Sequence, residues 1–132
     1  MMIPNEGSLA AHAIKTVKKV WGVEFWMVNT ELYCMKFLKI QPGFQSSIHA
    51  HALKDETFIG MMGTTQLNIH AGNGDVIDVH AIHPGEQYRL RPEVWHSFQA
   101  VNVSWIMEIS TTHSDRDVVR LQESRRLDGL VV

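Results

Sequence analysis

Residues 43–56 read GFQSSIHAHALKDE, and this stretch gathers side chains that commonly bind metal ions. His49 and His51 stand two residues apart, so on an extended strand they share one face, about 7 Å apart along the chain. Glu56 follows far enough behind His51 for a short turn and a return on the neighbouring strand. His96 is the natural fourth ligand, since it opens a later strand-like run. Two or three imidazoles and a carboxylate suit Zn, Mn, Fe, Ni or Co, so we expect one divalent metal ion held by these four residues.

Around this stretch the sequence is dominated by short runs of β-branched, aromatic and other apolar residues. The runs cover residues 24–28, 32–40, 57–62, 65–70, 76–83, 86–90, 97–101 and 104–110. Turn residues separate them, and Asn73-Gly74 is typical of a type I′ hairpin turn. Many short strands at even spacing predict an all-β sandwich or closed barrel in a single domain.

The two ends of the chain have a different character. Residues 8–20 could form a short helix or an irregular arm. Ser114 followed by Asp117 resembles a capping box, and Arg125 and Arg126 suit a last helical turn, which predicts a helix over residues 115–125. The expected division is an N-terminal arm (1–20), a barrel (21–112) and a C-terminal helix and tail (113–132).

Composition excludes several classes of protein. The 132 residues hold 12 Lys and Arg against 14 Asp and Glu, whereas a nucleic-acid-binding domain usually carries a basic excess. Cys34 is the single cysteine, so no intramolecular disulfide can form, which suits a reducing compartment. Residues 1–13 lack the apolar stretch of a signal peptide, and no run reaches the roughly 18 apolar residues of a membrane span. We expect a cytoplasmic globular protein with no nucleic-acid or membrane partner.

The spacing in residues 43–63 also resembles a known family. The pattern G-x5-H-x-H-x4-E-x6-G, matched by Gly43, His49, His51, Glu56 and Gly63, is the first motif of the cupin superfamily. The resemblance implies a small antiparallel, jelly-roll-like barrel, the double-stranded β-helix, with a metal inside.

The second cupin motif, G-x5-P-x-G-x2-H-x3-N, is matched in part. Gly85 and His96 stand at the right spacing. Arg91, Glu93 and Ala100 replace the proline, the second glycine and the asparagine. The departure keeps the ligand His96 and alters only the turn before it.

Residues 20–125 resemble more closely the C-terminal cupin domain of type II mannose-6-phosphate isomerases. The likeness lies in VWGVE (20–24), KFLKIQPG (36–43), and Glu108 followed by DVVR (117–120). Lys54 also occupies the place of a lysine found in cupin-type lyxose isomerases. The resemblance implies a sugar or sugar-phosphate isomerase or an epimerase-like relative, acting in carbohydrate metabolism on a small-molecule ligand.

Several charged residues are candidates for that chemistry. Lys54 has the parity of Glu56, and a buried position near a cation would lower its pKa, so we expect it to transfer protons, with Glu108 second. Lys36 has the parity of apolar strand residues and either pairs with Glu108 or contacts a sugar or phosphate. Tyr88 and Arg89 lie between Gly85 and His96 of the second motif and are candidates for the mouth of the barrel.

Two other functions stay open at this point. The same four ligands would suit an iron-dependent dioxygenase, and a barrel that binds a sugar without turnover is a third possibility. An unpaired barrel edge and an N-terminal arm favour a homodimer, because exposed edges are commonly covered or paired.

Overall fold

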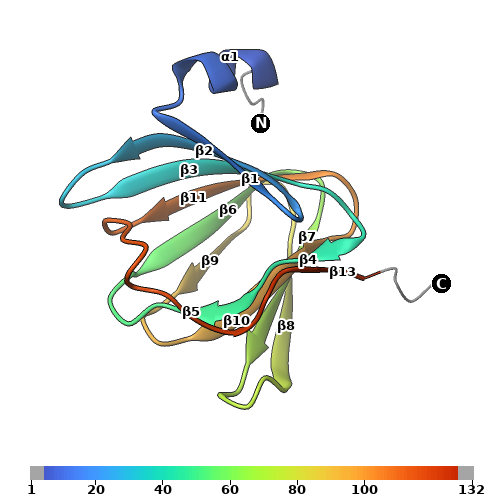
Figure 1. The fold of residues 1–132 in the computed structure, drawn as a ribbon. Coiled ribbons are helices and arrows are strands. Elements are labelled where there is room, and N and C mark those ends of the chain that lie inside the picture. The colour runs from blue at the N-terminus through green and yellow to red at the C-terminus, as the bar shows by residue number, and fades with distance from the viewer. Residues whose placement is uncertain (1–4, 128–132) are drawn as a thin grey trace.

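The computed structural model describes residues 5–127, which form two large antiparallel sheets, one small sheet and one helix (Figure 1). The six-stranded sheet has the order β1 (Lys15–Lys19), β2 (Gly22–Asn29), β3 (Cys34–Ile40), β11 (Ser104–Ser110), β6 (Glu56–Met62), β9 (Gln87–Leu90). The five-stranded sheet has the order β12 (Val119–Gln122), β5 (Ile48–Ala50), β10 (Trp95–Ala100), β7 (Thr65–His70), β8 (Val76–Ile82). The small sheet pairs β13 (Arg125–Arg126) with β4 (Phe44–Gln45). Among the described residues, no helix is long and apolar enough to cross a membrane.

The predicted all-β architecture is confirmed, and the eight predicted runs correspond to β2, β3 and β6 to β11. The hairpin between β7 and β8 is also present, but its turn is not type I′. Gly74 has a φ of 95°, whereas Asn73 is not among the residues with positive φ. Gly74 N–H donates to the Ala71 carbonyl, and Ala71 pairs with Asp75 across the loop. This is a three-residue loop in which only the glycine needs the left-handed region.

The N-terminal segment forms both a helix and a strand. Helix α1 (Glu6–His12) begins at Asn5, whose side chain accepts a hydrogen bond from the Ser8 amide, as an N-cap residue should. Strand β1 then adds residues 15–19 to the six-stranded sheet, so the sheet begins before residue 21, where the barrel was expected to start.

The C-terminal helix predicted over residues 115–125 is wrong. Ser114 and Asp117 do form one turn, since the Asp117 amide donates to the Ser114 carbonyl. The carboxylate of Asp117, however, accepts the amides of Leu53 and Lys54 instead of capping a helix. The following residues then pair with β5 and β4 as β12 and β13. A free sheet edge and β-branched residues therefore outweighed the local capping signal. Residues 128–132 of the predicted tail lie outside the described residues.

Two clusters of buried apolar residues pack against the sheets. The larger one lies between the two sheets and takes residues from both: Leu38, Ile40, Phe58, Leu90 and Ile106 from one, and Leu67, Ile82, Phe98 and Ala100 from the other. The second joins Leu9 of α1 to the outer face of the six-stranded sheet, where Phe25 and Trp105 stack with ring centroids 5.9 Å apart. One end of the space between the sheets is thereby filled with apolar side chains.

Candidate metal centre and catalytic cavity

Three histidines converge at the other end of that space. His49 lies on β5, His51 directly follows the strand, and His96 lies on β10, where it is the cross-strand partner of His49. Opposite residues of an antiparallel pair share a face, so pairing these two strands brings His49 and His96 together. One ring nitrogen from each histidine lies within 4.8 Å of the others. The structure thus contains a three-histidine site that could hold a divalent metal ion.

The hydrogen bonds of the rings orient all three for metal binding. Each Nδ1–H donates to a backbone carbonyl: His49 to Ser47 at 3.1 Å, His51 to Asp117 at 2.8 Å, and His96 to Val94 at 2.9 Å. That arrangement fixes the neutral tautomer and leaves each Nε2 lone pair free for a metal. Outer hydrogen bonds of this kind are the usual support of metal-binding histidines.

The protonation states and an unpaired atom agree with this assignment. Burial lowers the pKa of His51 and of His96 to about 4, and it holds the pKa of His49 well below 6.5. The rings are therefore neutral at pH 7, as a metal ligand must be. The Nε2 atom of His96 is buried and has no hydrogen-bond partner among the described residues. A buried polar atom without a partner is costly, and a metal ion would satisfy it. The residues present therefore fit a divalent metal.

Glu56 stands beside two of the three histidines. One of its carboxylate oxygens lies 3.4 Å from His51 Nε2 and 3.6 Å from His96 Nε2. Burial, together with the negative charge of Glu108, raises the pKa of Glu56 to about 8. A nearby divalent cation would favour the ionised carboxylate, so Glu56 remains our candidate for the fourth ligand.

Lys54 forms a buried ion pair with Glu108, which lies on β11. The Lys54 ammonium lies 2.8 Å from one carboxylate oxygen of Glu108 and 3.9 Å from Glu56, and both partners of the short pair are buried. The expectation that the pKa of Lys54 falls is not met by this arrangement. Burial favours a lower pKa, but the carboxylates of Glu108 and Glu56 outweigh it and raise the pKa of Lys54. Burial opposes ionisation of Glu108, yet Lys54 and Lys36 lower its pKa to about 2.

Lys36 is also buried in the cavity wall. It is the cross-strand partner of Glu108, and its ammonium lies 4.0 Å from that carboxylate and 3.8 Å from Glu24. The ammonium also stacks over the Trp26 ring, 3.9 Å from its centroid. The ion pair between Lys36 and Glu108 expected from strand parity is therefore present, although its geometry is loose.

His113 is a site residue that the sequence reasoning missed. Its Nδ1 accepts hydrogen bonds from Lys36 at 3.1 Å and from Lys54 at 3.4 Å, and its Nε2–H donates to Asp115. No motif signalled it, because residues 111–118 fold back onto the cavity only once the terminal strand pairs with β5. That same strand pairing places the Asp117 backbone against His51.

Tyr88 and Arg89 lie away from the cavity. Arg89 is exposed, and both of its bonded nitrogens donate to Asp55. Tyr88 packs against the apolar cluster and the His80 ring. Strand β9 is the edge strand next to β6, so its residues reach the outer rim and the apolar end instead of the mouth. The structure therefore places these two residues outside the cavity that the histidines and Lys54 line.

The turn before His96 explains how the altered second motif still works. Glu93, which stands where the motif has glycine, has a φ of 71° and is the one described non-glycine residue with positive φ. Its amide donates to the His51 carbonyl. The left-handed conformation is thus kept without glycine, and the turn still delivers His96 to the site.

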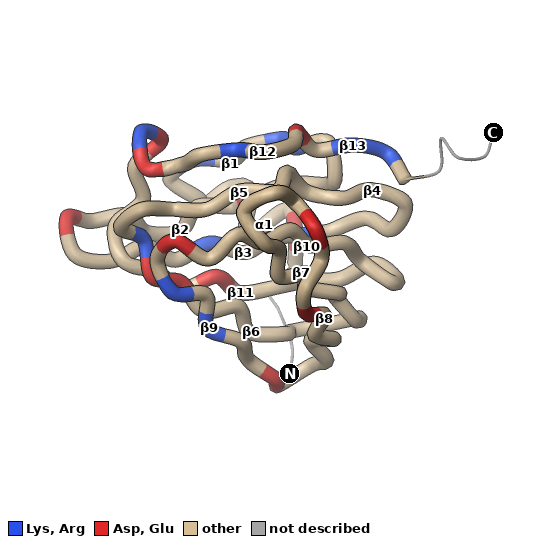
Figure 2. The backbone as a smooth tube through the Cα atoms, turned by 90° about the horizontal axis from the view of Figure 1, so that it is seen from below, with Lys and Arg blue, Asp and Glu red and all other residues tan. Residues whose placement is uncertain are grey.

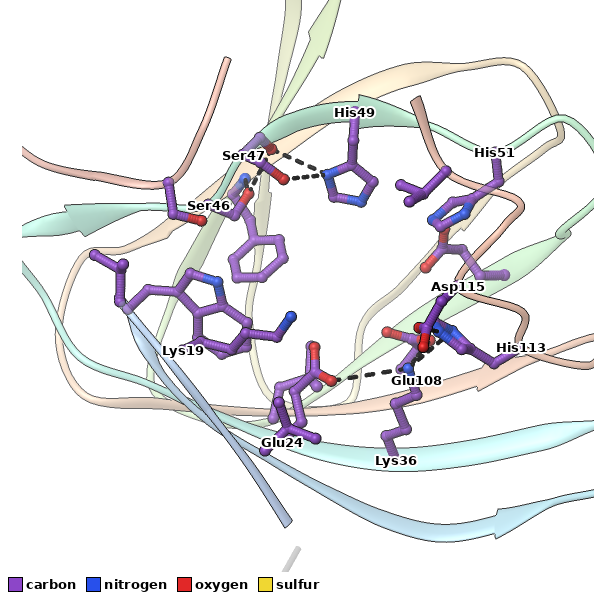
Figure 3. Close-up of a pocket in the computed structure, with 18 of the residues that line it drawn as sticks. Lys19, Glu24, Lys36, Ser46, Ser47, His49, His51, Glu108, His113 and Asp115 are labelled. Atoms are coloured by element: carbon purple, nitrogen blue, oxygen red, sulfur yellow. Dashed lines mark hydrogen bonds and ion pairs between the residues drawn. The ribbon is translucent and has the colours of Figure 1, made fainter. Parts of the chain in front are cut away.

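One cavity of about 690 Å³ lies between the two sheets and is lined by Lys36, His49, His51, Lys54, Glu56, Glu108 and His113. In Figure 3, His49 and His51 point into it from one side, while Glu24, Lys36 and Glu108 face them from the opposite sheet. Its volume is in the range of small-molecule sites. Two of the three histidines and the buried ionisable side chains of Lys36, Lys54, Glu56 and Glu108 therefore face the same cavity.

Comparisons with known proteins were made at the level of sequence and of structure. No family model and no curated protein matches the sequence. Oxalate decarboxylase from Bacillus subtilis matches with a TM-score of 0.68 and 16% identity, over 81% of this chain and 30% of that chain. KdgF from Halomonas sp. matches with a TM-score of 0.65 and 13% identity, over 77% of this chain and 89% of that chain. The chain thus spans about a third of the oxalate decarboxylase chains it matches.

At these identities the likeness concerns the fold. One of the matched Bacillus subtilis structures is described by its Mn(II) centres, so this fold holds a divalent metal in that protein. The finer resemblance to mannose-6-phosphate isomerases stays a prediction. The sheet order, the antiparallel pairing and these structural matches together show that the chain has the β-barrel fold of the cupin superfamily.

Proposed function

We propose that the chain is a metal-dependent isomerase of a sugar or sugar phosphate. The observation that supports this most is the buried Lys54–Glu108 ion pair, which lines the same cavity as His49 and His51 of the three-histidine site. Moving a hydrogen between neighbouring carbons of a hydroxy-carbonyl compound needs a base, an acid and a stabiliser of negative oxygen. The cavity supplies candidates for each.

The roles follow from the charges of the side chains. His49, His51, His96 and Glu56 would hold the metal, which when bound supplies Lewis-acid stabilisation of the substrate oxygens. The Glu108 carboxylate takes the proton from the hydroxyl-bearing carbon. The Lys54 ammonium gives a proton to the carbonyl oxygen. Glu108 then returns its proton to the former carbonyl carbon while the neighbouring hydroxyl gives its proton to Lys54, so both groups end as they began.

Lys36 and His113 have supporting places in this scheme. Lys36 lies 4.0 Å from the same Glu108 oxygen that pairs with Lys54, and His113 accepts from both lysines. They would hold the acid and the base in position while the substrate enters. The two matches named above are a decarboxylase and KdgF, so support for the isomerase reaction comes from these residues and from the sequence resemblance.

The test is proton exchange in heavy water. Protein reconstituted with Mn²⁺ or Zn²⁺ is incubated with a panel of aldoses and aldose phosphates in D₂O, and deuterium at C2 and ketose signals are followed by NMR. We expect exchange and ketose formation with at least one member. Glu108→Gln should lose both, whereas Lys39→Gln, which removes a lysine that pairs with Glu6 outside this cavity, should retain them.

The other outcomes discriminate between the remaining functions. Oxygen uptake by the Fe²⁺-loaded protein, without C2 exchange, would replace the proposal by a dioxygenase. Sugar binding with neither exchange nor oxygen uptake would leave a non-catalytic sugar-binding barrel.

A further inference from the structure

The mouth of the cavity carries cations that the proposed chemistry does not use. The cavity is lined at its rim by β1 of one sheet and β12 of the other, and both strands are edge strands. Figure 2 shows Lys and Arg positions along β1, β12 and β13 at one edge of the molecule. Lys15 and Lys19 come from β1, and Arg120 comes from β12.

The strand register aims these side chains inward. Arg120 is the cross-strand partner of His49, which is in turn the partner of His96. Opposite residues share a face, so the two histidines and the arginine form one row on the cavity side of three adjacent strands. On the other sheet, Lys15 pairs with the cavity-lining Trp26, and Lys19 shares its parity. Figure 3 shows Lys19 in the wall of the cavity.

The charged groups of Arg120 and Lys19 at the rim have different partners from those of Lys36 and Lys54 inside the cavity. Lys36 and Lys54 are buried and paired with carboxylates. Arg120 and Lys19 are exposed, and neither makes a side-chain hydrogen bond or ion pair with a residue in the described part of the chain. Glu123 lines the same rim but does not come within ion-pair distance of Arg120. A guanidinium that faces a binding cavity without an acceptor is free to bind an anion from solution.

We infer that Arg120, with Lys19 on the facing edge strand, binds an anionic group of the substrate, either a phosphate or a carboxylate. This rests on the proposed function in one respect, because it takes a polyhydroxylated, metal-chelating molecule as the ligand. Arg120 lies one strand beyond the metal site, so the anion it binds belongs to the part of the substrate away from the reacting carbons. The phosphate contact that was one expectation for Lys36 is thereby assigned to the mouth of the cavity.

Three unreactive probes with six-carbon chains test the inference. D-Glucitol is neutral, D-glucitol 6-phosphate adds a terminal phosphate, and D-gluconate has a terminal carboxylate. Their dissociation constants for the Mn²⁺-loaded protein are measured by calorimetry, with the metal content of every variant determined beforehand. The variants are Arg120→Gln, Arg120→Lys and, as a matched control, Arg91→Gln, which removes an exposed arginine outside the cavity.

We expect at least one anionic probe to bind about tenfold more tightly than glucitol, as one charge-assisted contact allows. Arg120→Gln should remove this advantage and leave the glucitol affinity unchanged. Arg120→Lys should retain part of it, and Arg91→Gln all of it. The advantage should also shrink as salt is added, because the group is exposed. The two anionic arms distinguish phosphate from carboxylate.

Equal affinity for all three probes, no binding of any probe, or an anionic advantage that persists in Arg120→Gln would overturn the inference. These results are separate from the exchange assay in D₂O. Anion selectivity without C2 exchange would refute the isomerase and leave the anion site standing. C2 exchange on neutral sugars without anion selectivity would do the reverse.

Discussion

Strands β3, β6 and β11 build both ends of the barrel interior, and the two ends have opposite chemistry. On each strand, one apolar residue of the core and one charged residue of the cavity lie two positions apart and therefore share a face. The pairs are Leu38 and Lys36, Phe58 and Glu56, and Ile106 and Glu108. All six side chains are buried. The apolar and the charged side chains are therefore equally buried, but they differ in how their burial affects the stability of the fold.

The apolar end stabilises the fold, while the charged end adds cost. Burying one large apolar side chain contributes about 1.5–3 kcal/mol. Burying an ion costs several kcal/mol, which a good partner only partly offsets. The buried charges therefore lower the stability of the fold relative to an apolar lining, and the apolar end offsets this cost. Changes at two positions on one strand can test this.

The largest loss of stability should come from the apolar end. Ile106→Ala removes a fully buried side chain from the core between the sheets and should lower the free energy of unfolding by about 4 kcal/mol. Because Ile106 does not line the cavity, the folded variant should keep the metal stoichiometry of the wild type. Urea unfolding and metal analysis measure the two quantities. Loss of metal from the folded variant would contradict the separation of the two ends.

Glu108→Gln, two residues along the same strand, should cost somewhat less, about 3 kcal/mol, the lower end of the range for breaking a buried ion pair. The loss arises because Lys54 and Lys36 lose their shared carboxylate, although Glu56, 3.9 Å from Lys54, still offers negative charge. Glu31→Gln, at an exposed position, is the matched control and should change stability by less than about 0.5 kcal/mol. An unchanged unfolding midpoint for Glu108→Gln would show that the pair is not coupled to the fold.

Acid should destabilise the metal-free protein through the charged end. Between pH 6.5 and 5.5 the three histidines stay neutral when folded but take up protons when unfolded, so stability falls as pH falls. Glu56 acts in the opposite direction, since its pKa is raised to about 8 and it gives up a proton on unfolding. The net loss over that pH unit should be about 2 kcal/mol.

Above pH 7 the contribution of Glu56 should dominate, so stability levels off and declines slightly toward pH 8. Unfolding curves at several pH values, with chelator present, measure the profile. Glu56→Gln should remove the decline and leave the acid limb. A profile that is flat between pH 5.5 and 6.5 would mean that the histidines are not held neutral.

The smallest effect should come from the turn that leads into His96. Glu93→Gly should raise the free energy of unfolding by about 1 kcal/mol, because a non-glycine residue in the left-handed region is strained by that order. Thermal unfolding measures it, and Glu31→Gly, an exposed position outside the left-handed region, is the control for glycine as such. A loss of stability would show that the Glu93 side chain contributes more than its backbone strain costs.

Period-two patterns were sufficient to predict most of the fold. The alternation of apolar residues predicted β2, β3 and β6 to β11, and strand parity placed His49 and His51 on one face. Strand parity also indicated that Lys36 and Glu108 face inward. These features depend on local periodicity, which is visible without knowledge of tertiary contacts, whereas His96 was added because it opens a later run and matches the second cupin motif.

The features that the sequence did not predict correctly share a different cause. Strand β12 and the placement of His113 depend on the free edge of β5, a partner that is distant in sequence. The raised pKa of Lys54 depends on which carboxylates meet it in space. The absence of Tyr88 and Arg89 from the cavity follows from the position of β9 at a sheet edge. A cytoplasmic location and a homodimer stay predictions.

The most direct test of the metal site is the metal content of the untagged protein, purified without chelator, measured by inductively coupled plasma mass spectrometry beside His96→Ala. The buried Nε2 of His96 has no hydrogen-bond partner among the described residues, so this variant removes the proposed ligand together with one hydrogen bond to Val94 and the packing of a buried ring. The account predicts about one equivalent of a divalent transition metal in the wild type and none above background in the variant. No metal in the wild type, even after reconstitution with Mn²⁺, Zn²⁺, Fe²⁺, Co²⁺ and Ni²⁺, would contradict it.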